Sequence, residues 1–249
     1  MDKKDKNEGK MTFLEHLEEL RKRIIYSIIA VLVGAIIGYI FSSHIVDFLT
    51  KPIKNLVYLS PTEAFVTVLK VSFITGIFIA LPLIFYHFWR FVKPALYPHE
   101  RKYFISAVFF STFFFLLGAF FAYAVVLPVA LRFLLSFQSE KLHATLSIAN
   151  YIFFISKLLL AFGIIFQLPI ISFFLTKMKI MKPQFLRKSR RIAIVLIFIV
   201  AALLTPPDVF TQLLMAGPLI LLFEISVWVS VFAAKTSKQT SPFSFEKKT

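Results

Sequence analysis

The 249-residue sequence contains no cysteine, so disulfide bonds and cysteine-ligated metals are excluded from the outset. It also lacks the phosphate-binding pattern G-x-x-x-x-G-K-[S/T], the zinc-binding pattern H-E-x-x-H and the nucleophile pattern G-x-S-x-G. The five histidines are scattered along the chain and form no close cluster with Asp or Glu. These absences predict that the protein is not an enzyme and that it uses no metal or other cofactor.

Acidic residues are also scarce, with 13 Asp and Glu against 28 Lys and Arg, which gives a formal net charge of +15. Such a charge could attract nucleic acid or a membrane surface. Hydrophobic residues, in contrast, make up 58% of the chain, and the mean hydropathy is +0.80. They gather in six long runs, at about 24–41, 66–89, 103–127, 151–175, 192–204 and 213–234. The runs predict an all-α, polytopic membrane protein with six transmembrane helices.

The basic residues are distributed unevenly among the segments that separate these runs. The segments on one side of the membrane, which include both termini, hold 22 of the 28 Lys and Arg residues, and the other side holds 4. Because cytoplasmic segments carry the excess of positive charge, the N- and C-termini are both predicted to be cytoplasmic. The basic residues then border lipid, which argues against a nucleic-acid partner.

The six runs are predicted to form a single domain, residues 12–234, between two polar ends. Residues 1–11 form a charged lead-in whose composition is typical of disorder. Residues 235–249 form a polar, basic tail. Thr12 and Glu15 have the spacing of a capping box, so the first helix is predicted to begin there.

Two segments outside the runs, 42–65 and 128–150, are too apolar for loops in water. We expect them to fold as short helices over the outer ends of the bundle. The first run contains Gly34 and Gly38 in the pattern G-x-x-x-G. This pattern is either a face for close packing against another helix or a chance occurrence of small residues.

Several runs contain features that interrupt a straight helix. Pro82, Pro169 and Pro218 each remove a backbone donor, which favours bent helices and a curved bundle. The fifth run, 192–204, has 13 residues, or roughly 20 Å of helix, whereas the hydrocarbon core is about 30 Å thick. The stretch Thr205-Pro206-Pro207-Asp208 then ends the helix. We therefore expect the bilayer to thin around this run.

Among the Lys, Arg, Asp, Glu, Asn and Gln residues, four lie within the runs: Lys70, Lys157, Gln167 and Glu224. Ionisable groups at membrane depth are costly and usually face protein or trapped water. The two lysines lie near outer ends and can extend to the membrane boundary. Glu224 is expected either to pair with a lysine across the bundle or to be protonated, and one carboxylate is weak support for a proton relay.

Four stretches, in order along the chain, resemble those of one known family. They are 17–23 (LEELRKR), 93–101 (KPALYPHER), 160–169 (LAFGIIFQLP) and 204–212 (LTPPDVFTQ). With these motifs the chain resembles the TatC family, the core receptor subunit of the twin-arginine protein translocase. The resemblance implies six helices in a curved, glove-like bundle with short fifth and sixth helices. It also implies the cytoplasmic (inner) membrane, with a thylakoid membrane as the alternative.

The resemblance implies that the cytoplasmic face binds the twin-arginine signal peptide of a folded cargo protein. The carboxylates of Glu19 and Glu100 would engage the two arginines. Two carboxylates on a basic face form an acidic spot that guanidinium groups can bind bidentately. Plainer roles stay open: Glu19 can pair only with Arg23, four residues on, and Glu100 can suit the dipole in the first turn of the third helix.

Further positions and partners follow from the same resemblance. Arg21 and Phe91 are implied to contribute to signal-peptide binding, and Pro52 to the outer face. Pro206 and Asp208 belong to the turn after the fifth run. The implied partners are single-span subunits of the TatA and TatB types, further copies of this chain and the lipid bilayer, in an export complex driven by the proton gradient.

The chain departs from the family pattern at Gln167, where many members have a glutamate. A mechanism that needs a carboxylate at this position does not carry over, although Gln167 can still hydrogen-bond a neighbouring helix. Two other functions were weighed. A secondary transporter of a small solute predicts repeated halves and a polar site at mid-membrane, and a structural scaffold has no use for the acidic pair.

Overall fold

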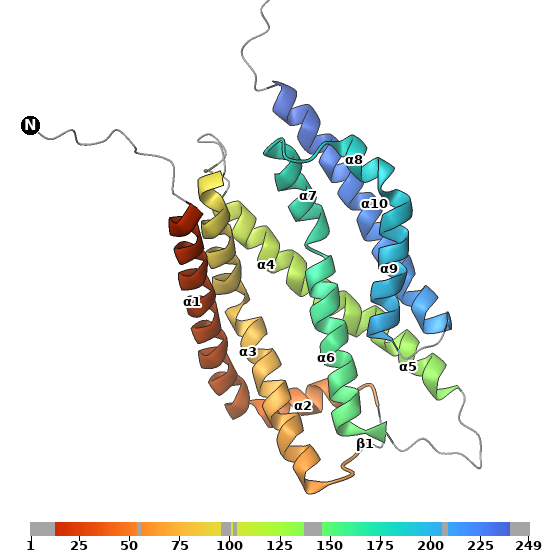
Figure 1. Cartoon of the computed structure of the whole chain (residues 1–249). Coiled ribbons are helices and arrows are strands. Elements are labelled where there is room, and N and C mark those ends of the chain that lie inside the picture. Colours follow the sequence, from red (N-terminus) through yellow and green to blue (C-terminus); the bar gives the residue numbers. More distant parts are fainter. Residues whose placement is uncertain are drawn as a thin grey trace, which may run out of the picture.

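The computed structural model describes residues 13–53, 56–95, 101, 104–136, 146–205 and 209–239. These residues form a helical bundle with one pair of very short parallel strands (Figure 1). The long elements are α1 (Phe13–Ile40), α3 (Pro61–Val92), α4 (Phe104–Phe121), α6 (Ile148–Ile165), α7 (Leu168–Lys177), α9 (Arg190–Leu204) and α10 (Val209–Gln239). The short ones are α2 (Ser42–Thr50), β1 (Leu56–Val57), η1 (Lys93–Ala95), η3 (Ala122–Val126), α5 (Leu127–Leu135), β2 (Leu146–Ser147) and α8 (Pro183–Lys188).

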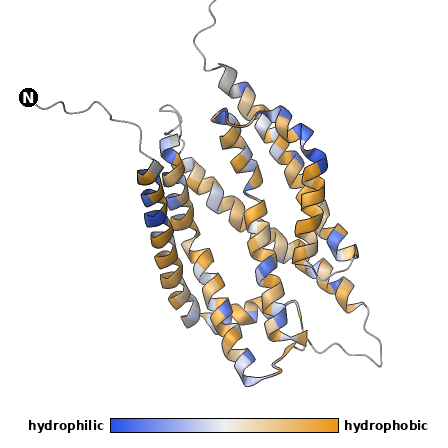
Figure 2. Ribbon diagram, viewed as in Figure 1, coloured by the Kyte–Doolittle hydropathy of each residue, from blue (hydrophilic) through white to orange (hydrophobic). Residues whose placement is uncertain are grey.

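Five stretches of the described chain are long and apolar enough to cross a membrane. They are Leu14–Ile40, Pro61–Val92, Phe104–Leu135, Ile148–Lys177 and Val209–Lys235. Large apolar side chains such as Ile36, Phe120 and Trp228 are exposed on these helices, as expected for surfaces that meet lipid. Apolar residues cover the middle of the bundle, whereas hydrophilic ones gather toward its ends (Figure 2). The predicted all-helical, multi-pass membrane fold is therefore confirmed.

The two ends of the bundle differ, and we name them by the short helices that lie there. The α8 face holds the start of α1, η1 and α8, whereas the α2 face holds α2 and β1 (Figure 1). The first helix is described from Phe13, so the predicted cap at Thr12 lies outside the described residues.

α6 lies at the centre of the bundle. Ile152, Ile155, Leu158 and Phe162 on this helix are completely buried, and α6 contacts α3, α4 and α9. The chain turns between the end of α6 and the start of α7, where Pro169 occupies the first turn and needs no backbone donor. The predicted break at this proline is confirmed, and it lets the fourth run follow a curved path.

The last two membrane helices differ sharply in length. α9 has 15 residues, which is about 22 Å of helix and short for a bilayer, as predicted. The prediction of a short sixth helix is wrong, because α10 has 31 residues. α10 continues through Pro218 and extends into the polar stretch 236–239, which was assigned to the tail.

The end of α9 is stabilised by side chains that bond its final carbonyl groups. Thr205 Oγ1 donates to Ala201 O at 3.0 Å, Gln212 Nε2 to Phe198 O at 3.0 Å, and Lys157 Nζ to Leu203 O at 2.6 Å. Leu203 O is one of the last four carbonyl groups of α9, which need such partners in an apolar setting, whereas Ala201 O also accepts from Thr205 N at 3.0 Å. Lys157 therefore caps the end of α9.

The α2 face is closed by the segment that follows α1, as predicted. α2 is a helix of nine residues, and β1 pairs in parallel with β2. Tyr123 and Tyr151 donate their hydroxyls to Phe48 O and Leu49 O, at 2.8 and 2.6 Å. Glu63 accepts from Leu59 N at 2.6 Å, from Ala149 N at 3.0 Å and from the Ser147 hydroxyl. Together these bonds join α2, the start of α3 and the start of α6.

Removing one tyrosine hydroxyl tests this closure. Tyr151 is only 5% exposed, so the change Tyr151→Phe leaves Leu49 O at the end of α2 without that partner. We expect the free energy of unfolding to fall by about 1 kcal/mol, which lowers Tm by about 2–4 °C. Thermal unfolding in detergent measures the change, with the exposed Tyr58→Phe as control. Equal Tm values for the two variants would contradict the prediction.

Candidate functional site

The candidate site is positioned by an unusually close contact between α1 and α3. A Cβ atom added at Gly34 would lie 2.7 Å from Gly76 O, and one at Gly38 would lie 2.7 Å from Ser72 O. A Cβ at Gly76 would lie 2.5 Å from Ala35 N. Real Cβ atoms do not approach backbone this closely, so only glycine fits. The G-x-x-x-G pattern is therefore a packing face, and its partner is α3 of the same chain.

This contact places Glu19 of α1 near the end of α3 on the α8 face. Arg23 Nε donates to Glu19 Oε1 at 2.7 Å, and Arg23 Nη2 donates to the same oxygen. On its other side, Arg23 Nη1 lies 3.5 Å from His87 Nδ1 of α3. The Glu19 side chain is 24% exposed and that of Arg23 is 14% exposed. Glu19 Oε2 has no partner among the described residues, so it can accept a further donor.

One turn further toward the α8 face, an aromatic contact joins the same two helices. The rings of His16 and Phe91 stack with centroids 4.2 Å apart and planes 15° apart. Both side chains are partly buried. The stack fixes the end of α3 against the start of α1, and Phe91 therefore lies one layer above the Glu19 and Arg23 pair.

Charges of both signs surround Glu19. Glu15 and Glu18 precede it on α1, Arg21 is exposed two residues later, and Arg90 near the end of α3 donates to the Tyr86 hydroxyl at 2.8 Å. A guanidinium that approaches this end of α1 can gain a direct, charge-assisted bond from the Glu19 carboxylate.

An apolar groove runs along α1 and α3, and Arg23, the partner of Glu19, is part of its lining. Its volume is about 410 Å³, and one end is formed by Leu20, Arg23, His87 and Phe91. Farther along it is lined by apolar side chains of both helices: Ile24, Ile28, Val31, Leu32, Phe73, Ile77, Ile84 and Phe88. We call the end formed by Leu20, Arg23, His87 and Phe91 the mouth of the groove. The rest of the groove is apolar and suits an extended or helical apolar segment.

Gln167 lies apart from that site and is fully engaged in the core. It is 7% exposed, and its Nε2 donates to Ser111 O at 3.1 Å and to Gly163 O at 3.3 Å. The Ser111 hydroxyl accepts from Trp89 Nε1 at 2.9 Å. Gln167 therefore hydrogen-bonds a neighbouring helix, as its chemistry allowed, and joins α3, α4 and the α6–α7 turn.

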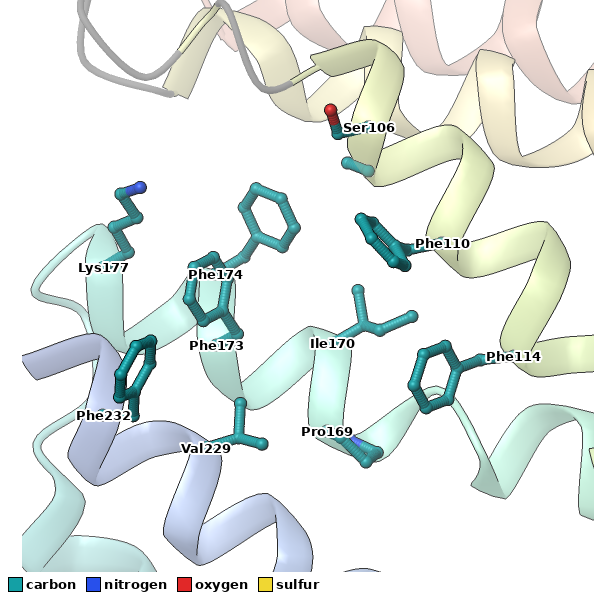
Figure 3. Close-up of a pocket in the computed structure, with 11 residues that line it drawn as sticks. Ser106, Phe110, Phe114, Pro169, Ile170, Phe173, Phe174, Lys177, Val229 and Phe232 are labelled. Carbon is teal, nitrogen blue, oxygen red and sulfur yellow. The ribbon is translucent and has the colours of Figure 1, made fainter. Parts of the chain in front are cut away.

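Beside this network an apolar recess of about 560 Å³ lies between α4, α7 and α10. Figure 3 shows Phe110 and Phe114 of α4 facing Ile170 of α7, with Phe232 of α10 nearby and Lys177 at the rim. The lining offers hydrocarbon contacts and few polar ones. Such a recess can hold an apolar chain but cannot orient a charged solute.

Among the described residues Glu224 pairs with an arginine and not with a lysine, which was one of the two alternatives that the sequence left open. Its Oε2 accepts from Arg190 Nη2 at 2.8 Å, and both side chains are partly exposed. The reason is the shortness of α9, whose basic first residue lies opposite the middle of α10. The Arg190 guanidinium therefore supplies a positive partner for the Glu224 carboxylate.

The remaining predicted residues fall on the α2 face or outside the described chain. Pro52 is exposed in the turn after α2, directly before the buried Ile53. Glu100, Pro206 and Asp208 lie outside the described residues.

Sequence reasoning missed two members of the site, His16 and His87, because they were judged only as scattered histidines. The Glu19 and Arg23 spacing was visible as an i, i+4 pair. The contact of Arg23 with His87 was not visible, because it joins residues 64 positions apart. This contact depends on how α1 is aligned along α3, which only the structure shows.

Comparisons with known proteins agree with this architecture. A sequence profile of the family described as "Sec-independent protein translocase protein (TatC)" matches residues 15–218. The Sec-independent protein translocase protein TatC of Desulforapulum autotrophicum is 44% identical over 229 residues, which cover 89% of this chain and 85% of that protein. The TatC protein of Aquifex aeolicus is 44% identical over 237 residues, 92% of this chain and 98% of that protein.

A solved structure is equally similar. It is described as the crystal structure of the twin arginine translocase receptor TatC, and it covers 88% of this chain and 99% of its own. The two folds superpose with a TM-score of 0.81 at 45% sequence identity. These matches favour a component of a protein translocase over a solute transporter or an enzyme. The chain therefore belongs to the TatC family of Sec-independent protein translocase proteins and has its six-helix membrane fold.

Proposed function

We propose that this chain is the core receptor subunit of a twin-arginine translocase and binds the signal peptides of folded proteins on its α8 face. The observation that carries the proposal is the carboxylate of Glu19, which is bound through one oxygen to Arg23, a residue that lines the α1–α3 groove. A twin-arginine peptide presents guanidinium groups followed by an apolar segment. The Glu19 carboxylate can bind a guanidinium group, and the groove can hold the apolar segment.

The α8 face is the cytoplasmic one in this proposal. The excess of Lys and Arg in the segments that reach this end supports the orientation, since cytoplasmic segments carry that excess. Cargo with an uncleaved signal peptide is met in the cytoplasm, so the recognition site and the basic face coincide. The membrane is the cytoplasmic (inner) membrane, as the bacterial relatives suggest.

Recognition uses a second carboxylate as well as Glu19. We assign this role to Glu100, in the segment between α3 and α4, because a pair of arginines needs a pair of acceptors. Arg21 and Phe91 contribute beside it: Phe91 covers the mouth of the groove and offers a face on which a guanidinium can stack. We assign Pro52 a structural role on the α2 face, and Pro206 and Asp208 a role in the segment that links α9 to α10.

The receptor does not work alone in this proposal. It recruits single-span subunits of the TatA and TatB types, assembles with further copies of itself, and uses the proton gradient as its energy source. The exposed apolar helices provide the surface for such partners within the bilayer.

The experiment is a crosslinking assay with the double variant Glu19→Ala and Glu100→Ala. A precursor that carries a photo-crosslinker beside its arginines is added to inverted membrane vesicles. Each lost charge-assisted bond contributes about 1.5–3 kcal/mol, so we expect at least a ten-fold loss of binding for each carboxylate. Glu18→Ala, an exposed neighbour on α1, is the matched control. Undiminished crosslinking in the double variant would reject the proposal.

A further inference from the structure

A second charged surface lies far from Glu19, where α8, the start of α9 and α10 meet. It is a recess of about 500 Å³ with two kinds of lining. Arg187, Arg190 and Lys235 contribute three cations, and four apolar side chains of α10 form the remainder: Val227, Trp228, Val231 and Phe232. The recess therefore combines a cationic part with an apolar wall.

The charges in the recess are only partly balanced. Arg190 is paired with Glu224 at 2.8 Å, as described above. Among the described residues, no carboxylate forms an ion pair with Arg187 or Lys235. The recess therefore keeps a net positive charge at the α8 face, where hydrophilic residues gather around α8 (Figure 2).

The apolar wall lies on the membrane side of Lys235. Trp228 precedes Lys235 by seven residues, which is about 10 Å along a helix. The indole is 76% exposed, although it is large and apolar. Exposed tryptophan is typical of the level at which lipid headgroups meet acyl chains. The distance between Lys235 and the indole of Trp228 therefore matches the distance between the headgroup of a phospholipid and the first part of its acyl chains.

We propose that this recess binds an anionic phospholipid, with its phosphate at Arg187 and Lys235 and its acyl chains along Trp228. Basic recesses between membrane helices suit such headgroups, because the phosphate gains several donors while the chains stay in hydrocarbon. The shortness of α9 creates the site, since it draws Arg187 and Arg190 down beside the apolar part of α10. The inference needs only the membrane fold and is independent of signal-peptide binding.

The test uses Trp228 as the reporter. The protein is reconstituted into phosphatidylcholine vesicles with a minor fraction of phosphatidylglycerol, and bromine atoms are placed on the acyl chains of one lipid or the other. Brominated chains quench nearby tryptophan. The only other tryptophan, Trp89, is 3% exposed, and a Trp228→Phe variant measures its background. We expect brominated phosphatidylglycerol to quench Trp228 well beyond its share of the lipid.

The variant Arg187→Gln with Lys235→Gln should remove this preference. A basic residue at an anionic membrane surface contributes about 1 kcal/mol, so each change should lower the relative affinity about five-fold, and the pair about 25-fold. Lys188→Gln with Arg191→Gln is the matched control, because it removes the same charge from α8 and α9 at exposed positions outside the recess. Circular dichroism verifies that both variants are folded.

Three results would overturn the proposal. Quenching in proportion to the lipid composition would show no selective site. An equal loss in the control pair would show a general surface charge effect. Displacement of the lipid by glycerol phosphate, which has the charge but no acyl chains, would show a site for soluble anions.

Discussion

Replacing Gly76 by alanine should separate α1 from α3 and weaken both the fold and the recognition site. The new Cβ would lie 2.5 Å from Ala35 N and 2.6 Å from Val31 O, which are backbone atoms that no side-chain rotation can move away. The helices must therefore shift apart along their whole contact. Overpacking of this kind costs about 1–3 kcal/mol, and we expect Tm to fall by about 2–4 °C for each kcal/mol lost.

The chain offers a matched control for this change at Gly217. An added Cβ there meets nothing within 4 Å, and alanine is favoured over glycine in a helix by about 1 kcal/mol. Gly217→Ala should therefore leave Tm unchanged or raise it, although the chemical change is identical. Thermal unfolding of the two variants in one detergent compares them directly. If Gly76→Ala behaves as Gly217→Ala does, the close contact does not hold the two helices together.

The same substitution should act on signal-peptide binding from a distance. Gly76 precedes His87 by eleven residues, about 16 Å along α3, and touches no part of the groove mouth. The mouth is nevertheless built half from α1 and half from α3, which the stack of His16 on Phe91 joins. We therefore expect weaker precursor crosslinking in Gly76→Ala and normal crosslinking in Gly217→Ala.

This dependence on register explains what the sequence could and could not reveal. Apolar runs and the distribution of Lys and Arg report on single segments, so the helices could be located within a few residues. The Gly34 and Gly38 pattern likewise marked a close-packing face. Its partner on α3 was not visible, because Gly76 stands alone in an apolar run and only the crossing of two helices gives it a role.

The two corrections have different origins. The short sixth helix was implied by the family resemblance, yet α10 continues through Pro218 into polar residues and has 31 residues. For Glu224 the sequence left a lysine partner or protonation open, but the position of α9 brings Arg190 to it instead. The offset between neighbouring helices decided this contact, and local composition does not report that offset.

The second large effect concerns the two partners of the ion pair in the site. Glu19→Gln removes the charge that a guanidinium requires, so the affinity for a twin-arginine peptide should fall ten- to hundred-fold. Arg23→Gln removes the cation that occupies the same carboxylate in the free protein. A partly exposed pair of this kind contributes at most about 1 kcal/mol, so the affinity should stay unchanged or rise by up to about five-fold.

These opposite responses separate recognition from a structural role, because an ion pair that merely stabilises α1 must respond alike when either partner is removed. Titration of a fluorescent twin-arginine peptide into purified protein measures both variants, with Glu18→Gln as the control for a lost charge on the same helix. Added salt should weaken binding to the wild type and affect Glu19→Gln less, since one screened attraction is already gone. A fall of equal size in Glu19→Gln and Arg23→Gln would assign Glu19 to the helix and require another acceptor for the arginines.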